Sequence, residues 1–179
     1  KTAPMIGKGM DKYKFAITVS PVDCTGCGSC SNVCPAKNKA LDMMPYEEET
    51  EQQEIYDYAL KHFTDKDLRF PDNLTREAQF HRPLLEFSGA CGGCGETPYA
   101  KLVTQLFGDH MYIANATGCS SIWGGSAPST PYTVNSQGRG PAWENSLFED
   151  NAEFGYGMKL AVRQRRAKLH SVITELAKN

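Results

Sequence analysis

The chain has 179 residues, of which 40% are hydrophobic and 10% aromatic, and this suits one folded domain or two small ones. Its formal net charge of −2 argues against nucleic acid or an anionic membrane as a partner. No apolar stretch approaches the roughly 20 residues of a membrane span, and the N-terminus lacks a signal-peptide pattern. We therefore expect a cytoplasmic protein.

The first part, residues 1–45, contains a short alternating pattern followed by four cysteines. Phe15, Ile17 and Val19 alternate with smaller or polar residues and predict a half-buried strand that leads into the cysteines. The four cysteines form a CxxCxxCxxxCP run and are Cys24, Cys27, Cys30 and Cys34. This spacing, with small residues in the gaps, is typical of a 4Fe-4S cluster, whereas a zinc knuckle usually has two separated pairs.

The second part, residues 46–87, is polar and predicts one helix and then a connecting segment. Thr50 and Gln53 have capping-box spacing, and Ile55, Tyr58 and Ala59 follow on one helical face. The stretch 64–84 contains two prolines and little periodicity, so we expect it to cross between domains.

The third part, residues 88–179, predicts an α/β arrangement. Pro98 suits the start of a helix that ends at Gly108, and the apolar stretch 111–116 predicts a strand. A glycine- and proline-rich segment occupies 118–141. Residues 149–179 then show apolar positions close to a 3.6-residue period, which predicts a long amphipathic helix, broken at Gly155 or Gly157.

Three further cysteines lie in this third part. Cys91 and Cys94 occupy a glycine-rich loop directly before the first helix, and Cys119 follows the predicted strand, where α/β folds place ligands. A thioredoxin-like dithiol is the alternative, but the glycines and the third cysteine favour a cluster. Such a cluster needs a fourth ligand, and the fourth cysteine of the first run normally ligates a second cluster. Either this chain holds its clusters in an unusual way, with Cys34 or a non-cysteine residue as the missing ligand, or it is part of a longer protein.

Four segments of the sequence resemble the long, single-chain pyruvate:ferredoxin oxidoreductases that depend on thiamine diphosphate. They are "CTGCGSCSNVCPAK", "GACGGCGETPY", "ATGCSSIWGG" and "GRGPAWENSLFEDNAEFGYGM". The resemblance covers nearly the whole chain and implies an internal segment. It implies half of a two-cluster ferredoxin-like domain at 1–45, the connecting segment at 46–87, and the first part of a thiamine-diphosphate-binding α/β domain at 88–179.

The resemblance also implies roles for individual residues. Cys24, Cys27 and Cys30 would bind one cluster of the ferredoxin-like domain, Cys34 the other, and Cys91, Cys94 and Cys119 the cluster nearest the cofactor. Glu96 resembles a thiamine-contacting residue, and Cys119 would also line the cofactor site. From the residues alone, Glu96 could simply be a surface charge at a helix N-terminus. Turn chemistry explains Ser120, Ser121 and the loop after them.

The activity implied is oxidative decarboxylation of pyruvate to acetyl-CoA and CO2, with electrons passing through three 4Fe-4S clusters to ferredoxin or flavodoxin. Pyruvate, coenzyme A, the remainder of the enzyme and a second copy in a homodimer are the implied partners. The GDG motif that anchors the diphosphate is absent, so the Mg²⁺ ligands would lie outside this chain, and no catalytic residue is assigned. A stand-alone ferredoxin-like electron-transfer protein is the alternative.

Overall fold

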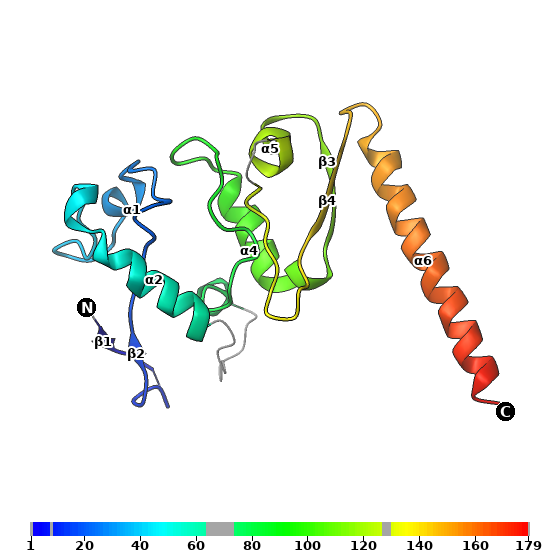
Figure 1. Cartoon of the computed structure of the whole chain (residues 1–179), viewed down its shortest axis with the longest axis horizontal. Coiled ribbons are helices and arrows are strands. Elements are labelled where there is room, and N and C mark those ends of the chain that lie inside the picture. Colours follow the sequence, from blue (N-terminus) through cyan, green and yellow to red (C-terminus); the bar gives the residue numbers. More distant parts are fainter. Residues whose placement is uncertain (1, 8, 64–73, 127–129, 179) are drawn as a thin grey trace. The chain divides into compact units, whose positions relative to one another are not determined.

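The computed structural model describes residues 2–7, 9–63, 74–126 and 130–178 (Figure 1). The chain forms two compact units, Lys1–Arg69 and Phe70–Asn179. Helices and two small sheets make it a mixed α and β protein, as expected. The first ten residues of the predicted 64–84 segment, 64–73, lie outside the described residues.

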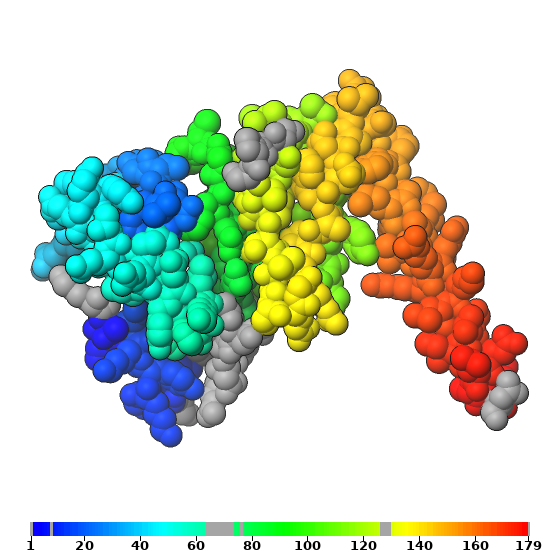
Figure 2. Space-filling model, viewed as in Figure 1, coloured from blue at the N-terminus to red at the C-terminus, as the bar shows by residue number. Residues whose placement is uncertain are grey.

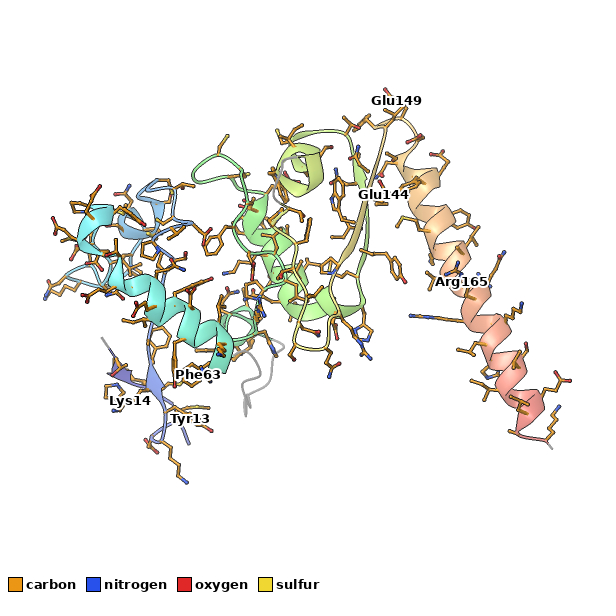
Figure 3. All side chains as sticks on the ribbon, in the orientation of Figure 1. Tyr13, Lys14, Phe63, Glu144, Glu149 and Arg165 are labelled. Atoms are coloured by element: carbon orange, nitrogen blue, oxygen red, sulfur yellow. The ribbon has the colours of Figure 1, made fainter. Side chains whose placement is uncertain are left out.

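In the first unit, the predicted strand is much shorter than the alternating pattern suggests. Only Lys14–Phe15 (β2) is a strand, paired antiparallel with Ala3–Pro4 (β1). Ile17 is 54% exposed and Val19 is 47% exposed, so the alternation does not mark a buried face. The prediction of a half-buried strand up to the cysteines was wrong, because β1 offers a partner for only two residues. Figure 3 labels Tyr13 and Lys14 at this hairpin.

Three helical segments follow in the first unit. A short helix, Ser29–Asn32 (α1), lies within the cysteine run, and a 3-10 turn, Tyr46–Glu48 (η1), precedes the helix Glu51–His62 (α2).

Helix α2 confirms the predicted helix but not its capping box. Thr50 has helical backbone angles and makes no side-chain cap bond. The Gln53 side chain instead accepts a hydrogen bond from Ser20 Oγ at 2.8 Å and donates one to Asp57 Oδ1 at 2.9 Å. Tyr58 is 58% exposed, so the predicted apolar face is not the covered one. The side chain of Gln53 therefore bonds to Ser20, just before the cysteine run, and does not cap the N-terminus of α2.

The second unit begins with two helices around a small core. Helix Thr75–Ala78 (α3) contacts helix Thr97–Phe107 (α4), which continues into the 3-10 turn Gly108–His110 (η2). Gly108 ends α4 as predicted, and it is needed for space, because a Cβ there would lie 2.9 Å from Leu84 Cδ1. Among the residues that the structure describes in this unit, the buried apolar side chains are Ala78, Leu84, Leu85 and Trp123.

A pair of parallel strands forms the sheet of the second unit. Strand Tyr112–Ala116 (β3) was predicted, but its neighbour Ala142–Ser146 (β4) was not. The connection between them carries the short helix Cys119–Ser121 (α5) and the π-helical turn Ile122–Ser126 (η3). Figure 1 shows the two strands side by side, with α5 close to their upper end in this view. The glycine-rich stretch is thus the crossover that parallel strands require.

The two faces of this strand pair are covered by different elements. Register places Ile113 opposite Trp143 and Asn115 opposite Asn145, so these side chains share one face. Trp143 packs there against the η3 glycines, since a Cβ at Gly124 would lie 3.2 Å from its Nε1. Residues of the other parity, such as Glu144 in Figure 3, belong to the opposite face.

The last element is the helix Asn151–Leu176 (α6), which contacts β3. It runs unbroken through both glycines, so the predicted break was wrong. A Cβ at Gly155 would lie 3.2 Å from Ala114 Cβ, so this glycine serves close packing against β3. Leu169, Ile173 and Leu176 are more than half exposed. In Figure 2 the orange-to-red half of α6 stands clear of the other described elements of its unit.

None of the helices described here is both long and apolar enough to cross a bilayer.

Candidate iron–sulfur and cofactor site

The first cysteine loop is an exposed turn built on left-handed glycines. Gly26 and Gly28 have φ of 68° and 73°, a region that favours glycine over residues with a Cβ. Cys24, Cys27 and Cys30 are exposed and Cys34 is half-buried, and all four are free thiols. The chain can therefore present several sulfur atoms from a short stretch of backbone.

Ser20 anchors the start of this loop and is fully buried. Its hydroxyl lies 2.6 Å from Asp23 Oδ2 and 2.8 Å from Gln53 Oε1, and it donates to one of them at a time. The Asp23 amide donates to the Ser20 hydroxyl at 3.3 Å. The Cys24 amide donates to the Ser20 carbonyl at 3.1 Å. This side-chain turn fixes the first cysteine to α2.

Two thiols of the loop have environments that favour the thiolate. The Cys34 sulfur accepts a hydrogen bond from the Ala40 amide at 3.2 Å, and this bond lowers the pKa of Cys34. The pKa of Cys27 is lowered mainly by the Ser29 side chain, whose hydroxyl lies 3.5 Å from the sulfur. Thiolates are the form that binds iron, and amide bonds to sulfur are typical of cluster loops.

The second cysteine pair lies on a tight turn before α4. The Cys94 amide donates to the Cys91 carbonyl at 3.0 Å, and Gly93 at the third position has φ of 75°. A positive φ at this position is typical of a type II turn. Thr97 Oγ1 donates to the Cys94 carbonyl at 3.3 Å, which ties the turn to the first residue of α4. Cys91 is exposed and Cys94 half-buried.

Cys119 is the first residue of α5 and is exposed. It follows the carboxyl end of β3, the place where open α/β sheets bind their ligands. The structure thus confirms a strand before Cys119, which is the context that the sequence predicted.

Glu96 is the N-cap residue of α4, but its side chain makes no capping hydrogen bond. Its charge acts on Tyr132, whose pKa is raised by burial and, less strongly, by Glu96. Tyr132 is held near this point because its segment pairs with residues 84–86, with the Glu86 amide donating to the Pro131 carbonyl at 2.8 Å. Glu96 is exposed.

Among the described residues, the structure brings no three cysteine, histidine or carboxylate side chains into one group that could hold a metal ion. Ligation by the seven cysteines therefore stays a prediction. The donor set nevertheless fits iron–sulfur chemistry: all seven are free, all lie in loops or at helix ends, and one accepts an amide hydrogen bond.

Sequence reasoning missed the side chains that hold the Cys119 segment in place. Asn115 and Asn145 are bonded to each other at 2.9 Å, and Ser121, attributed above to turn chemistry, is 3% exposed and bonded to Asn145 at 2.9 Å. The available signal was an asparagine inside the apolar stretch 111–116, because strands disfavour asparagine unless it has a partner.

No family model matches the chain. Several relatives match it over most of its length. One is a pyruvate:ferredoxin oxidoreductase of Moorella thermoacetica, 62% identical over 175 residues, which are 97% of this chain and 15% of the relative. A pyruvate-flavodoxin oxidoreductase of Klebsiella pneumoniae is 58% identical over 163 residues, 89% of this chain and 14% of the relative. A pyruvate dehydrogenase [NADP(+)] of Cryptosporidium parvum is 51% identical over 169 residues, 94% of this chain and 9% of the relative.

The chain spans about 15% of the length of the first of these relatives. An identity of 62% over 97% of the chain leaves no room for a chance likeness. The chain belongs, as one segment, to the pyruvate:ferredoxin and pyruvate-flavodoxin oxidoreductases.

Proposed function

We propose that this chain is the electron-transfer segment of an enzyme that oxidatively decarboxylates pyruvate to acetyl-CoA and CO2 and reduces ferredoxin or flavodoxin. The observation that carries the proposal is the 62% identity over 97% of the chain to a pyruvate:ferredoxin oxidoreductase. The first cysteine loop supports it, because its environment lowers the pKa of Cys27 and of Cys34. A reducing cytoplasm would keep such thiols free.

The first cysteine loop would belong to a ferredoxin-like domain completed by another part of the enzyme. Cys24, Cys27 and Cys30 would hold one 4Fe-4S cluster and Cys34 a second. The left-handed glycines let the backbone turn tightly around the sulfur atoms, and the Ala40 amide donates to the Cys34 sulfur. Ser20 and Gln53 keep the loop attached to α2.

The second unit would belong to the thiamine-diphosphate-binding domain. Cys91, Cys94 and Cys119 would hold a third 4Fe-4S cluster, with a fourth ligand from elsewhere. Glu96 would present its carboxylate to the thiamine ring, and Mg²⁺ would be held by residues outside this chain. When bound, thiamine diphosphate supplies an electron sink for decarboxylation, and the clusters supply one-electron carriers.

The identity of the electron acceptor is expected to depend on other parts of the enzyme. Relatives named for ferredoxin, for flavodoxin and for NADP(+) all contain a segment at least 51% identical to this chain. A segment shared to this degree does not distinguish the acceptors. Coenzyme A and the homodimer remain predictions from the resemblance.

Two substitutions in the full-length enzyme test the two cofactor roles separately. Cys27→Ser is expected to lower the iron content and leave thiamine diphosphate bound, because it removes a cluster ligand only. Glu96→Gln is expected to leave the iron content unchanged and weaken thiamine diphosphate binding at least severalfold, because it removes a charge beside the ring. Iron assay and calorimetric titration with thiamine diphosphate, on the same samples, measure both.

Matched controls are available for each substitution. Ser31→Ala changes a residue of α1 between Cys30 and Cys34 and removes no thiol, and Glu149→Gln removes an exposed carboxylate that lies in the loop before α6 (Figure 3). A wild-type enzyme that contains no iron, or a Glu96→Gln enzyme that binds thiamine diphosphate as tightly as Glu149→Gln, would contradict the corresponding part of the proposal.

A further inference from the structure

Asn115 and Asn145 form a side-chain pair across the parallel strands β3 and β4. They are direct neighbours in the register, and Asn115 Nδ2 donates to Asn145 Oδ1 at 2.9 Å. Asparagine is depleted in strands because its side chain competes for backbone hydrogen bonds. A bonded pair at one level of a two-stranded sheet therefore calls for an explanation other than strand stability.

Ser121 links this pair to the chain that follows β3. Its hydroxyl donates either to Asn145 Oδ1 at 2.9 Å or to the Ala116 carbonyl at 3.2 Å, and it accepts from Asn115 Nδ2 at 3.2 Å. It also accepts from the Gly118 amide at 2.9 Å. With 3% exposure, Ser121 is out of reach of bulk water, so these protein groups are the partners that satisfy its hydroxyl. We call Asn115, Ser121 and Asn145 the polar clamp.

The clamp and a second set of bonds fix both ends of the segment that carries Cys119. At the near end, the amide and the hydroxyl of Thr117 donate to the Ser146 carbonyl at 3.0 Å and 2.8 Å. Asn145 Nδ2 donates to Thr117 Oγ1 at 3.2 Å. At the far end, Ser121 is bonded to Asn145 as above. Cys119 lies between the two anchors, two residues from each, and is itself exposed.

We propose that the polar clamp positions the Cys119 sulfur as a cluster ligand, an inference that rests on the proposed function. An exposed cysteine on a short helix has no packing of its own to fix its direction. The bonds of Thr117 and Ser121 to β4 supply that fixation, so the sulfur is held relative to the sheet. Asn115, Ser121 and Asn145 are positioning residues that act through Cys119.

Removal of the clamp has two expected effects. Ser121→Ala leaves the Gly118 amide and Asn145 Oδ1 each with one partner fewer, at a cost of about 1–3 kcal/mol. Amide hydrogen exchange in residues 117–121 should therefore rise roughly 5- to 150-fold. In the reduced full-length enzyme, the electron paramagnetic resonance signal and reduction potential of the cluster bound by Cys119 should change. The signals of the other two clusters should not change, and they serve as internal references.

Substitutions at Asn145 and Ser146 separate positioning from general destabilisation. Asn145→Asp keeps an acceptor for Ser121 and is expected to retain more of the normal signal than Asn145→Leu, which has a similar shape and no polar atoms. Ser146→Ala is the matched control. It removes a hydroxyl from the neighbouring position on the other face of β4, where Ser146 Oγ donates to Asn151 Oδ1 at 3.1 Å. It should leave all three clusters unchanged.

Cys119→Ser in the same enzyme distinguishes failure of the inference from failure of the proposed function. If Cys119→Ser removes one cluster while Ser121→Ala and Asn145→Leu keep a wild-type signal and potential, the clamp does not position the ligand. An equal change in Ser146→Ala also overturns the inference. If Cys119→Ser leaves every cluster intact, the proposed ligand role of Cys119 is wrong, and the inference is overturned together with it.

Discussion

Gly125→Ala is expected to loosen the turn behind Cys119, because the new methyl group has no room beside Trp143. A Cβ at Gly125 would lie 2.3 Å from Cζ3 and 2.6 Å from Cη2 of the indole. Carbon atoms in good contact lie about 3.5–4.0 Å apart, so the ring or the turn must move by roughly 1 Å or more. At Gly124 the closest approach is 3.2 Å, to Nε1 of the same ring, and a shift of a few tenths of an ångström relieves it.

The size of the effect follows from the rigidity of the indole. Overpacking of a well-packed site costs about 1–3 kcal/mol, and a half-buried tryptophan ring has few alternative positions. Local opening should therefore become roughly 5- to 150-fold more frequent in Gly125→Ala and less than about fivefold more frequent in Gly124→Ala. Hydrogen exchange of residues 119–125 and 142–146 in the full-length enzyme measures this directly.

A double substitution tests whether Trp143 is the cause. In a Trp143→Leu background the ring is gone, so Gly125→Ala should cost much less than it does in the wild type. Equal exchange in Gly124→Ala and Gly125→Ala, or an unchanged cost of Gly125→Ala in the Trp143→Leu background, would refute the reasoning.

Three further predictions concern other parts of the chain. Gln53→Leu should raise hydrogen exchange in residues 20–24 roughly tenfold, since it removes the α2 acceptor of the buried Ser20 hydroxyl, and unchanged exchange there would contradict the anchor. Gly28→Ala should destabilise the cysteine loop by about 1–2 kcal/mol, measured by the same exchange experiment, because φ there is 73° and the space around it is otherwise open. The raised pKa of Tyr132 means that the folded state holds the phenol proton more tightly than the unfolded state. Its contribution to stability is therefore complete below pH 10 and is lost as the pH rises through the raised value. In ultraviolet titrations read as the difference from Tyr132→Phe, Glu96→Gln should lower this pKa, and no change would show that burial alone raises it.

Local signals predicted the two long helices of the second unit, α4 and α6, well. Pro98 near the start and Gly108 at the end delimit α4, and the apolar period of the last thirty or so residues predicts α6. The break expected at Gly155 did not occur, because a single glycine costs only about 1 kcal/mol in a helix. A glycine at position 155 allows α6 to pack closely on Ala114.

The strands were predicted less well, because a strand needs a partner that the local sequence does not name. The alternating stretch begins at Phe15, but the strand pairing includes only Lys14 and Phe15 and ends there. Strand β4 was missed because its residues pair with distant ones. Trp143 lies opposite Ile113, and Asn145 lies opposite Asn115. Register of this kind is a non-local property.

The candidate site divides in the same way. Cysteine spacing alone predicts which residues would bind a cluster, since ligand type and spacing are properties of the sequence. The groups that hold the cysteine-bearing segments in place could not be predicted in this way. Ser20 acts through Gln53, 33 positions away, and Ser121 acts through Asn145, 24 positions away. Hydrogen bonds over such separations become visible only once the chain is folded.

The two-stranded sheet of β3 and β4 can accept further strands at its edges. β3 and β4 each have one edge with no neighbouring strand among the described residues. A further strand would add through the backbone at either edge, whereas Asn115, Asn145 and Trp143 project from a face. The sheet can therefore be widened from either side while the segment between Thr117 and Ser121 keeps its anchors. Strands could therefore be added to the sheet without changing the bonds that would position the Cys119 sulfur.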